Sequence, residues 1–249
     1  MSVIAQAGAK GRQLHKFGGS SLADVKCYLR VAGIMTEYSQ PGDMMVVSAA
    51  GSTTNQLISW LKLSQSDRLA AHQVQQSLRR YHTELIGGLL EPAAADTLIA
   101  AFIHDLERLA GLLDGGVSEA VYAEVVGHGE VWSARLMAAV LNQLGMEAAW
   151  LDARAFLRAE RAAQPQVDEG LSYPLLQQLM AQHPNKRLVV TGFISRNQAG
   201  ETVLLGRNGS DYSATQIGAL AGASRVTIWS DVAGVYSADP RKVKDACLL

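Results

Sequence analysis

The sequence has 249 residues, of which 48% are hydrophobic and 18% are charged, and its formal net charge is -1. This size and composition are typical of a globular enzyme with one large α/β domain or two smaller ones. The balanced charge argues against a nucleic-acid-binding protein, and no apolar run is long enough to span a membrane. Two distant cysteines, Cys27 and Cys247, and an N-terminus without an apolar leader predict a cytoplasmic protein rather than a disulfide scaffold.

The first elements predict a β-α-β unit. Residues 14–17 form a short apolar run that enters a glycine turn, and Leu22, Val25 and Leu29 follow at helical spacing. Residues 44–48 then form a second apolar run, which is followed by a loop of small residues. A strand, a helix and a second strand in this order are typical of a parallel sheet.

The middle of the chain, residues 56–113, is rich in Leu, Ala, Gln and Arg and poor in strand signals. Pro92 divides it, so we expect a helical insert that forms a hairpin or a lid. Three histidines lie in this segment, and we assign them to the surface or to packing: His72, His82 and His104.

The α/β alternation resumes after the insert. Residues 117–144 predict two helices that meet at the Gly-His-Gly sequence of residues 127–129. Further strands are predicted at residues 148–151, 187–191, 203–205 and 226–229, and further helices at residues 172–182 and 211–221. We therefore expect one α/β domain with a mostly parallel sheet, whose ligands bind at the carboxyl ends of the strands.

A phosphate-binding turn is predicted at residues 16–21, which read KFGGSS. Paired glycines after a strand let the backbone approach a phosphate, and Lys16 adds a mobile positive charge. The sequence is neither a Walker A loop nor GxGxxG, so spacing alone leaves a plain turn with a solvated lysine as an alternative.

A second glycine-rich turn lies at residues 205–213, which read LGRNGSDYS. Arg207 offers a planar fork that suits a carboxylate, and Ser210 is a good helix N-cap. Asp211 falls in the first helical turn, where its alternative role is to complement the helix dipole. The two turns together predict two halves of one site for an anionic substrate.

Two other segments carry weaker signals. Residues 229–241 read WSDVAGVYSADPR and could hold a nucleotide, although alone they also fit an ordinary surface loop. Glu130, which follows the Gly-His-Gly sequence near an expected helix start, either complements the dipole or binds a substrate ammonium. No HExxH spacing or nearby cysteine pair occurs, so we expect no metal site built from protein side chains.

In combination and in this order, KFGGSS, GHGE, LGRNGSDYSA and WSDVAGVYSADPR resemble the aspartokinase family across essentially the whole chain. The GRNGSDYSA form is most similar to bifunctional aspartokinase–homoserine dehydrogenases, in particular those of the methionine-repressed type. The resemblance implies a three-layer αβα sandwich of the amino acid kinase or carbamate kinase type with a helical insert. It also implies transfer of the γ-phosphoryl group of ATP, with Mg²⁺, to the side-chain carboxylate of L-aspartate. That reaction begins the route to lysine, threonine and methionine.

The resemblance implies a role for each matching residue. Lys16, Phe17, Gly18 and Gly19 hold the transferring phosphoryl group, and Asp211 orients Lys16. The residues that it places around aspartate are Ser48, Thr54, Glu130, Phe193, Arg207 and Ser210. The residues that it places in the nucleotide loop are Ser230, Asp231, Tyr236 and Arg241.

The end of the chain departs from the family pattern, because relatives continue with more of the kinase domain, regulatory domains and, in bifunctional members, a dehydrogenase. We therefore expect a kinase domain over residues 1–249 that is truncated at its C-terminal end, from a parent protein that is a homodimer. One alternative is a kinase for glutamate, carbamate or a nucleoside monophosphate, and another is a folded fragment without turnover. A dinucleotide-binding module is disfavoured because no GxGxxG follows a predicted strand.

Overall fold

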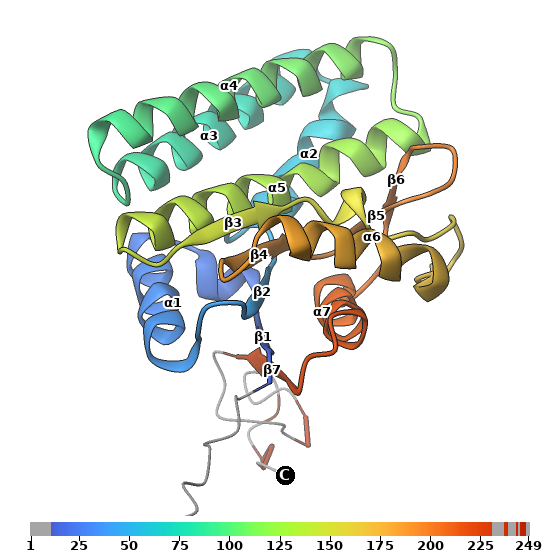
Figure 1. Cartoon of the computed structure of the whole chain (residues 1–249). Coiled ribbons are helices and arrows are strands. Elements are labelled where there is room, and N and C mark those ends of the chain that lie inside the picture. Colours follow the sequence, from blue (N-terminus) through green and yellow to red (C-terminus); the bar gives the residue numbers. More distant parts are fainter. Residues whose placement is uncertain (1–10, 231–236, 239–242, 244, 248–249) are drawn as a thin grey trace, which may run out of the picture.

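The computed structural model describes residues 11–230, 237–238, 243 and 245–247. Its centre is a five-stranded, entirely parallel sheet with the strand order β3-β4-β2-β1-β7 (Figure 1). The strands are β1 (Gln13–Phe17), β2 (Met44–Val47), β3 (Ala148–Leu151), β4 (Arg187–Thr191) and β7 (Arg225–Trp229). The central strands β1, β2 and β4 are almost entirely buried, as expected for a parallel sheet that is covered on both faces.

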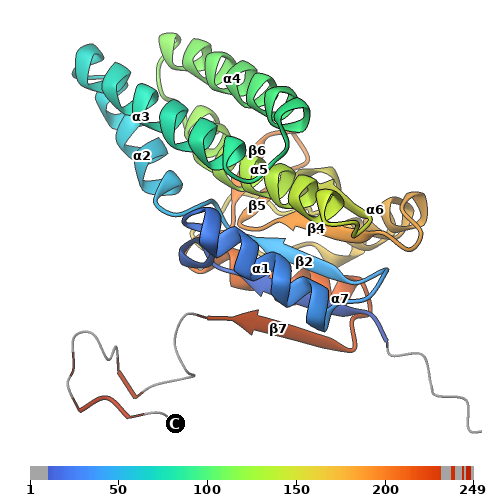
Figure 2. The ribbon, with the colours of Figure 1, turned by 90° about the vertical axis from the view of Figure 1, so that its left-hand side faces the viewer.

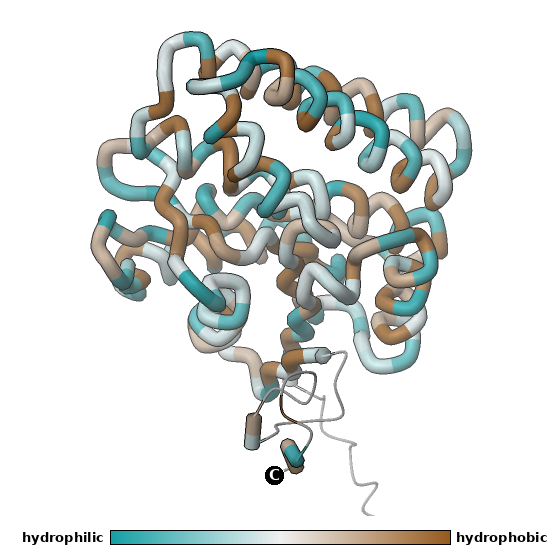
Figure 3. Tube along the Cα trace, turned by 180° about the vertical axis from the view of Figure 1, so that it is seen from behind, coloured by the Kyte–Doolittle hydropathy of each residue, from teal (hydrophilic) through white to brown (hydrophobic). Residues whose placement is uncertain are grey.

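Helices cover both faces of the sheet, which gives the αβα sandwich that the resemblance to aspartokinases implies. One face packs against α1 (Val25–Tyr38) and α5 (Glu119–Gln143), and the other against α6 (Glu169–Gln182) and α7 (Gly209–Leu220). Brown, hydrophobic stretches of the trace run through the centre of the molecule between these layers (Figure 3). Among the described helices, none is both long enough and apolar enough to cross a membrane.

The middle of the chain folds into three helices outside the sandwich, α2 (Thr53–Ser64), α3 (Arg68–Gly87) and α4 (Pro92–Asp114). They pack against one another, and α2 and α4 also pack against the outer side of α5 (Figure 2). Helix α5 thus lies between the helical layer and the sheet. The Asp67 carboxylate accepts a hydrogen bond from the Ala70 N–H at the start of α3, and Pro92 opens α4. We call α2, α3 and α4 the helical insert.

The predicted break at residues 127–129 is wrong, because α5 is one continuous helix through that segment. Its glycines allow close packing instead. A Cβ atom on Gly127 would lie 2.6 Å from Ile194 Cγ2, and one on Gly129 would lie 2.7 Å from Ala49 Cβ. Glu130 consequently lies inside a buried helix, not near a helix start.

Two other features differ from the sequence prediction. Asn208, with φ of 57°, is the N-cap of α7, so Ser210 lies inside the helix and is not the cap. A short antiparallel hairpin of β5 (Ile194–Arg196) and β6 (Thr202–Leu204) follows β4, and the sequence predicts only its second strand. The hairpin leads the chain from the end of β4 back to the start of α7.

Candidate active site

A pocket of about 430 Å³ opens at the carboxyl ends of β1, β2 and β4. It is closed by the start of α7 and by one turn of α5. Its lining contains most of the residues that the sequence motifs single out: Lys16, Gly18, Gly19, Ser48, Thr54, Glu130, Phe193, Ser210 and Asp211. The parallel sheet thus brings together side chains that are up to 195 positions apart, as the topology predicts.

Lys16 and Asp211 form an ion pair, with 2.6 Å between Lys16 Nζ and Asp211 Oδ1. Side chains alternate along β1, so Lys16 shares with Leu14 the face that packs against α7. The lysine side chain is 11% exposed and the aspartate side chain is 40% exposed, so the pair lies at the pocket wall rather than in the core. Asp211 therefore fixes the direction of the lysine ammonium.

The turn after β1 is held tightly against the loop after β2. A Cβ atom on Gly19 would lie 2.7 Å from the Ala49 carbonyl oxygen, and the Gly51 N–H donates to the Gly19 carbonyl at 3.0 Å. Phe17 is fully buried and stacks on Trp229, with ring centroids 5.9 Å apart. Only the backbone of Phe17 can therefore contact a ligand.

Glu130 is the buried carboxyl group of the pocket, and only 3% of the residue is exposed. Its Oε1 atom accepts a hydrogen bond from the Ala49 N–H at 3.1 Å, whereas Oε2 has no hydrogen-bond partner. Burial raises the pKa of Glu130 to about 8, against a smaller lowering by the Ala49 N–H. A buried carboxyl oxygen without a partner at a pocket wall is suited to a cationic ligand group.

The segment 48–54 forms one wall of the pocket. Ser48 and Thr54 both line it, and Thr54 lies in the first turn of α2 rather than in a loop. Its neighbour Thr53 points away into the protein and contacts the buried ring of His82 on α3. The contact between Thr53 and His82 is not predictable from the local sequence, because it depends on how the helical insert packs.

Phe193 and Ser210 lie where the end of β4 meets the start of α7. Phe193 has a left-handed backbone with φ of 67°, which is unusual for an aromatic residue. Its N–H donates to Ser213 Oγ at 2.8 Å, and a Cβ atom on Gly209 would lie 2.6 Å from its ring. The strained backbone is thus held by α7, at the wall of the pocket.

Arg207 does not line this pocket. It is exposed and lies in an adjoining groove of about 390 Å³, whose walls include Pro165, Leu205 and Tyr212. Gly206, the residue before Arg207, lines both the pocket and the groove, so the backbone of Arg207 lies at the boundary between them. Gly206, with φ of 79°, and Asn208, with φ of 57°, flank the arginine.

The predicted nucleotide loop is described only at its start. Trp229 pairs in register with Phe17, and this register places Ser230 at the same edge of the sheet as the glycine turn. Asp231, Tyr236 and Arg241 lie outside the described residues.

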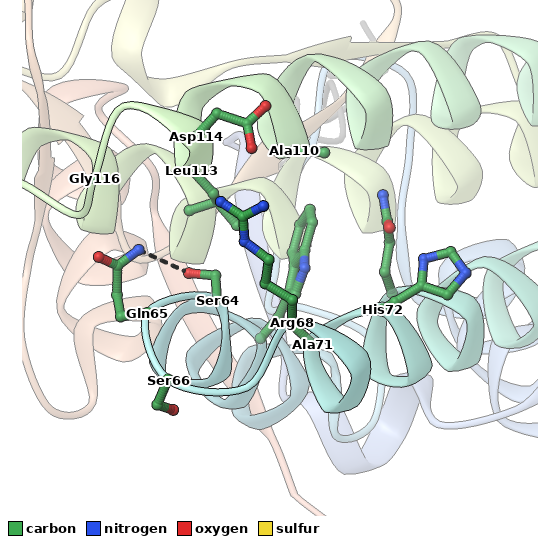
Figure 4. A pocket seen from close by; sticks show the side chains of 12 residues that line it. Ser64, Gln65, Ser66, Arg68, Ala71, His72, Ala110, Leu113, Asp114 and Gly116 are labelled. Carbon is green, nitrogen blue, oxygen red and sulfur yellow. Dashed lines mark hydrogen bonds between the residues drawn. The ribbon is translucent and has the colours of Figure 1, made fainter.

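A larger hollow, of about 580 Å³, lies in the helical insert between the α2–α3 turn and the end of α4 (Figure 4). Its rim carries polar side chains such as Arg68, His72 and Asp114, and Gln65 donates to Ser64 Oγ at 3.2 Å. None of the residues predicted from the motifs lines it, so size alone does not identify the site. Within the described part of the chain, no group of three or more His, Cys, Asp or Glu side chains could hold a metal ion.

The chain is similar to known kinases over most of its length. Residues 11–249 match the sequence model of the amino acid kinase family. The chain is 87% identical over 249 residues to bifunctional aspartokinase/homoserine dehydrogenase 2 of Escherichia coli, and it spans 31% of that relative. It is 32% identical over 234 residues to lysine-sensitive aspartokinase 3 of Escherichia coli, covering 93% of this chain and 51% of that protein.

A solved structure shows the same fold. The crystal structure of Escherichia coli aspartokinase III in complex with aspartate and ADP superposes with a TM-score of 0.86 at 28% sequence identity. The alignment covers 96% of this chain and 53% of that one. The chain therefore spans about half the length of that protein and about a third of the bifunctional relative.

Proposed function

The chain belongs to the amino acid kinase family, and on this premise we propose that it transfers the γ-phosphoryl group of ATP to the side-chain carboxylate of L-aspartate. The product is 4-phospho-L-aspartate. The observation that carries this proposal is one pocket with a lysine–aspartate ion pair and a buried, half-paired glutamate. The aspartokinase relatives, one of them solved with aspartate and ADP, support the same substrates.

Glu130 is proposed to bind the α-ammonium group of aspartate through Oε2, the oxygen without a partner. Ser48, Thr54 and Ser210 offer hydroxyl groups at the same pocket for the carboxylates of the substrate. Arg207 would supply a guanidinium for a carboxylate after the flanking backbone at Gly206 and Asn208 turns it from the groove into the pocket.

The proposed reaction needs no general base, because a carboxylate is already ionised near neutral pH. The protein must hold the carboxylate oxygen in line with the γ-phosphorus and neutralise charge on the transferring group. Lys16, oriented by Asp211, is the cation that this pocket offers for that purpose. Gly18 and Gly19 let the backbone approach the phosphate.

The nucleotide is proposed to lie between the glycine turn and the segment that starts at Ser230, with Asp231, Tyr236 and Arg241 as further contacts. The residues of the pocket fit a Mg²⁺ ion that arrives with ATP, since Asp211 is the carboxylate placed to contact its water shell. When bound, Mg²⁺ would neutralise phosphate charge.

We extend the proposal to the parent protein, by analogy with the bifunctional relative. It would carry a homoserine dehydrogenase part beyond this kinase part and act as a cytoplasmic homo-oligomer. Two cysteines, Cys27 and Cys247, that are free in the structure agree with a reducing compartment.

The test is a hydroxamate assay for the acyl phosphate with ATP and Mg²⁺, run with aspartate, glutamate and carbamate in parallel. We expect product with aspartate only, and calorimetry should show that the chain binds aspartate. Turnover with glutamate or carbamate instead would identify a different amino acid kinase. Binding of neither aspartate nor ATP would contradict the proposal for this chain.

A further inference from the structure

We propose that His82, on α3 of the helical insert, is a positioning residue for aspartate binding, because it fixes Thr53 and thereby the pocket wall formed by residues 48–54. This inference rests on the proposed function. It gives the helical insert a part in substrate recognition, although no residue of α3 or α4 lines the pocket itself.

Hydrogen-bond geometry defines the contact. Thr53 Oγ1 lies 2.6 Å from the Ala50 carbonyl oxygen and 3.2 Å from His82 Nε2. A hydroxyl group has one proton, and the carbonyl can only accept, so Thr53 donates to Ala50. His82 must then donate from Nε2–H to Thr53, which requires the neutral Nε2–H tautomer.

The surroundings of His82 keep the ring neutral and fix its orientation. The residue is 2% exposed, and its ring centroid lies 5.0 Å from Tyr81, 4.9 Å from Phe102 and 5.0 Å from Trp132. Burial lowers the pKa of His82 to about 3, so the ring stays neutral under ordinary conditions.

One of the three rings around His82, that of Trp132, is itself held by a hydrogen bond. Trp132 Nε1–H donates to Asp105 Oδ2 at 3.2 Å, and Arg135 donates to the same oxygen at 2.5 Å. The chain of contacts therefore runs from an ion pair between α4 and α5 through an indole and an imidazole to the first turn of α2.

The wall that His82 supports is held from the other side by α5. Glu130 accepts the Ala49 N–H, and the absence of a side chain on Gly129 lets the helix approach Ala49 and Thr53. Tyr81, next to His82, donates its hydroxyl to the Ala23 carbonyl at 3.0 Å, close to Gly51. Four residues of this clamped wall line the pocket: Ser48, Ala49, Gly51 and Thr54.

The test compares His82→Leu with His82→Gln, whose amide Nε2–H can replace the donor to Thr53. His104→Leu, on the exposed face of α4, is the matched control. We expect His82→Leu to raise the aspartate Kd and KM about tenfold, the effect of one lost buried hydrogen bond. Its KM for ATP should stay within about twofold of the wild-type value, and His82→Gln should recover most of the aspartate affinity.

A second variant, Thr53→Val, keeps the shape of the side chain and removes the hydroxyl. Because it also removes the hydrogen bond to the Ala50 carbonyl, it should raise the aspartate Kd and KM at least as much as His82→Leu does. The double variant should be no worse than Thr53→Val alone, since that variant has already lost the contact with His82. Thr53→Val alone tests the contact even if His82→Leu folds poorly.

Unchanged aspartate affinity in both His82→Leu and Thr53→Val would overturn the inference. So would a loss of thermal stability with equal changes for aspartate and ATP, which would indicate a purely structural histidine. If the wild-type chain itself binds no aspartate, the proposed function fails first and this inference falls with it.

Discussion

Lys16 reaches the pocket through the alternation of side chains on β1, and Asp211 reaches it from the first turn of α7. We expect Lys16→Ala to lower kcat by about 10²–10³-fold, because it removes the cation that we propose to stabilise the transferring phosphoryl group. The KM for aspartate should change less than about threefold, since we propose that the α-ammonium group of aspartate binds Glu130 and not Lys16. Steady-state kinetics on Lys16→Ala and on Lys62→Ala, an exposed lysine at the end of α2, would measure this. A variant that retains turnover would remove Lys16 from the proposed mechanism.

Arg207 presents a different case, because its guanidinium lies outside the pocket in this structure. We expect Arg207→Ala to raise the KM for aspartate by about 10–100-fold with a smaller effect on kcat, as for a lost carboxylate contact. Arg158→Ala, a charge change remote from the pocket lining, is the comparison. A KM for aspartate equal to that of the wild type would mean that the arginine stays in its groove.

Glu130 predicts a pH dependence of substrate binding. Burial raises its pKa to about 8 in the free protein, but it must be ionised to bind an ammonium group. Aspartate affinity should therefore increase as the pH rises towards 8, by up to about tenfold per pH unit below that value. Calorimetric titrations between pH 6 and 8 on wild type and Glu130→Gln would show it, with a weak and nearly flat profile in the variant. A steep profile that survives in Glu130→Gln would assign the titration to another group.

At the scale of elements, the five strands of the parallel sheet followed from local sequence, whereas β5 and the long helix α5 did not. β1, β2, β3, β4 and β7 lie within one residue of the predicted ends, because apolar runs bounded by glycine or polar residues identify buried parallel strands. The error in α5 arose because Gly127 and Gly129 carry a strong local break signal. Their packing against Ile194 and Ala49 is a tertiary contact that local sequence does not contain.

The same distinction applies to the candidate site. The glycine turns, Lys16 and Asp211 were recognisable, because each lies directly after a strand or at a helix start where phosphates and anions bind. The contact between Thr53 and His82 was not, since it joins the first turn of α2 to the middle of α3. The position of Arg207 was not either, because it depends on the backbone angles of its neighbours.

The packing of α5 gives a prediction for the element. Gly129→Ala should lower the free energy of unfolding by about 1–3 kcal/mol, because the new methyl group would meet Ala49 at 2.7 Å. Gly111→Ala, in α4 with open space around it, should raise stability by about 0.5–1 kcal/mol through helix propensity. Denaturant unfolding of both variants measures the difference. Equal stabilisation by the two substitutions would show that α5 does not need a glycine at 129.

At the scale of the whole molecule, a cluster of charges joins the helical insert to the αβα sandwich. Glu124 on α5 accepts from Arg108 of α4 at 3.1 Å, from Arg154 of the 3-10 turn after β3 at 2.7 Å and from Thr202 of β6 at 2.6 Å. His128 accepts from Arg108 through Nε2 at 2.7 Å, so its Nδ1–H donates to the Glu124 carbonyl. Side chains from α4, from the 3-10 turn after β3 and from β6 thus meet at one carboxylate of α5.

This cluster should govern how the molecule responds to acid. Burial alone would raise the pKa of Glu124, but Arg154, Thr202 and the other partners lower it to about 2. A carboxyl whose pKa is lower in the folded state stabilises the protein above its unfolded pKa, near 4.5, and loses that contribution as the pH falls towards 2.

Glu124→Gln should therefore lower the free energy of unfolding by about 2–3 kcal/mol at pH 7, because Arg154 loses a charged partner while it stays buried. Between pH 4.5 and pH 2.5 the gap between the variant and the wild type should narrow, since the Glu124 carboxyl of the unfolded chain takes up a proton there while that of the folded protein stays ionised. Denaturant unfolding across this range, with Glu107→Gln on the exposed side of α4 as the control, measures both effects. A gap that stays constant through the acid range would show that the loss comes from packing. In that case the charge of Glu124 would contribute nothing to holding the helical insert against the sandwich.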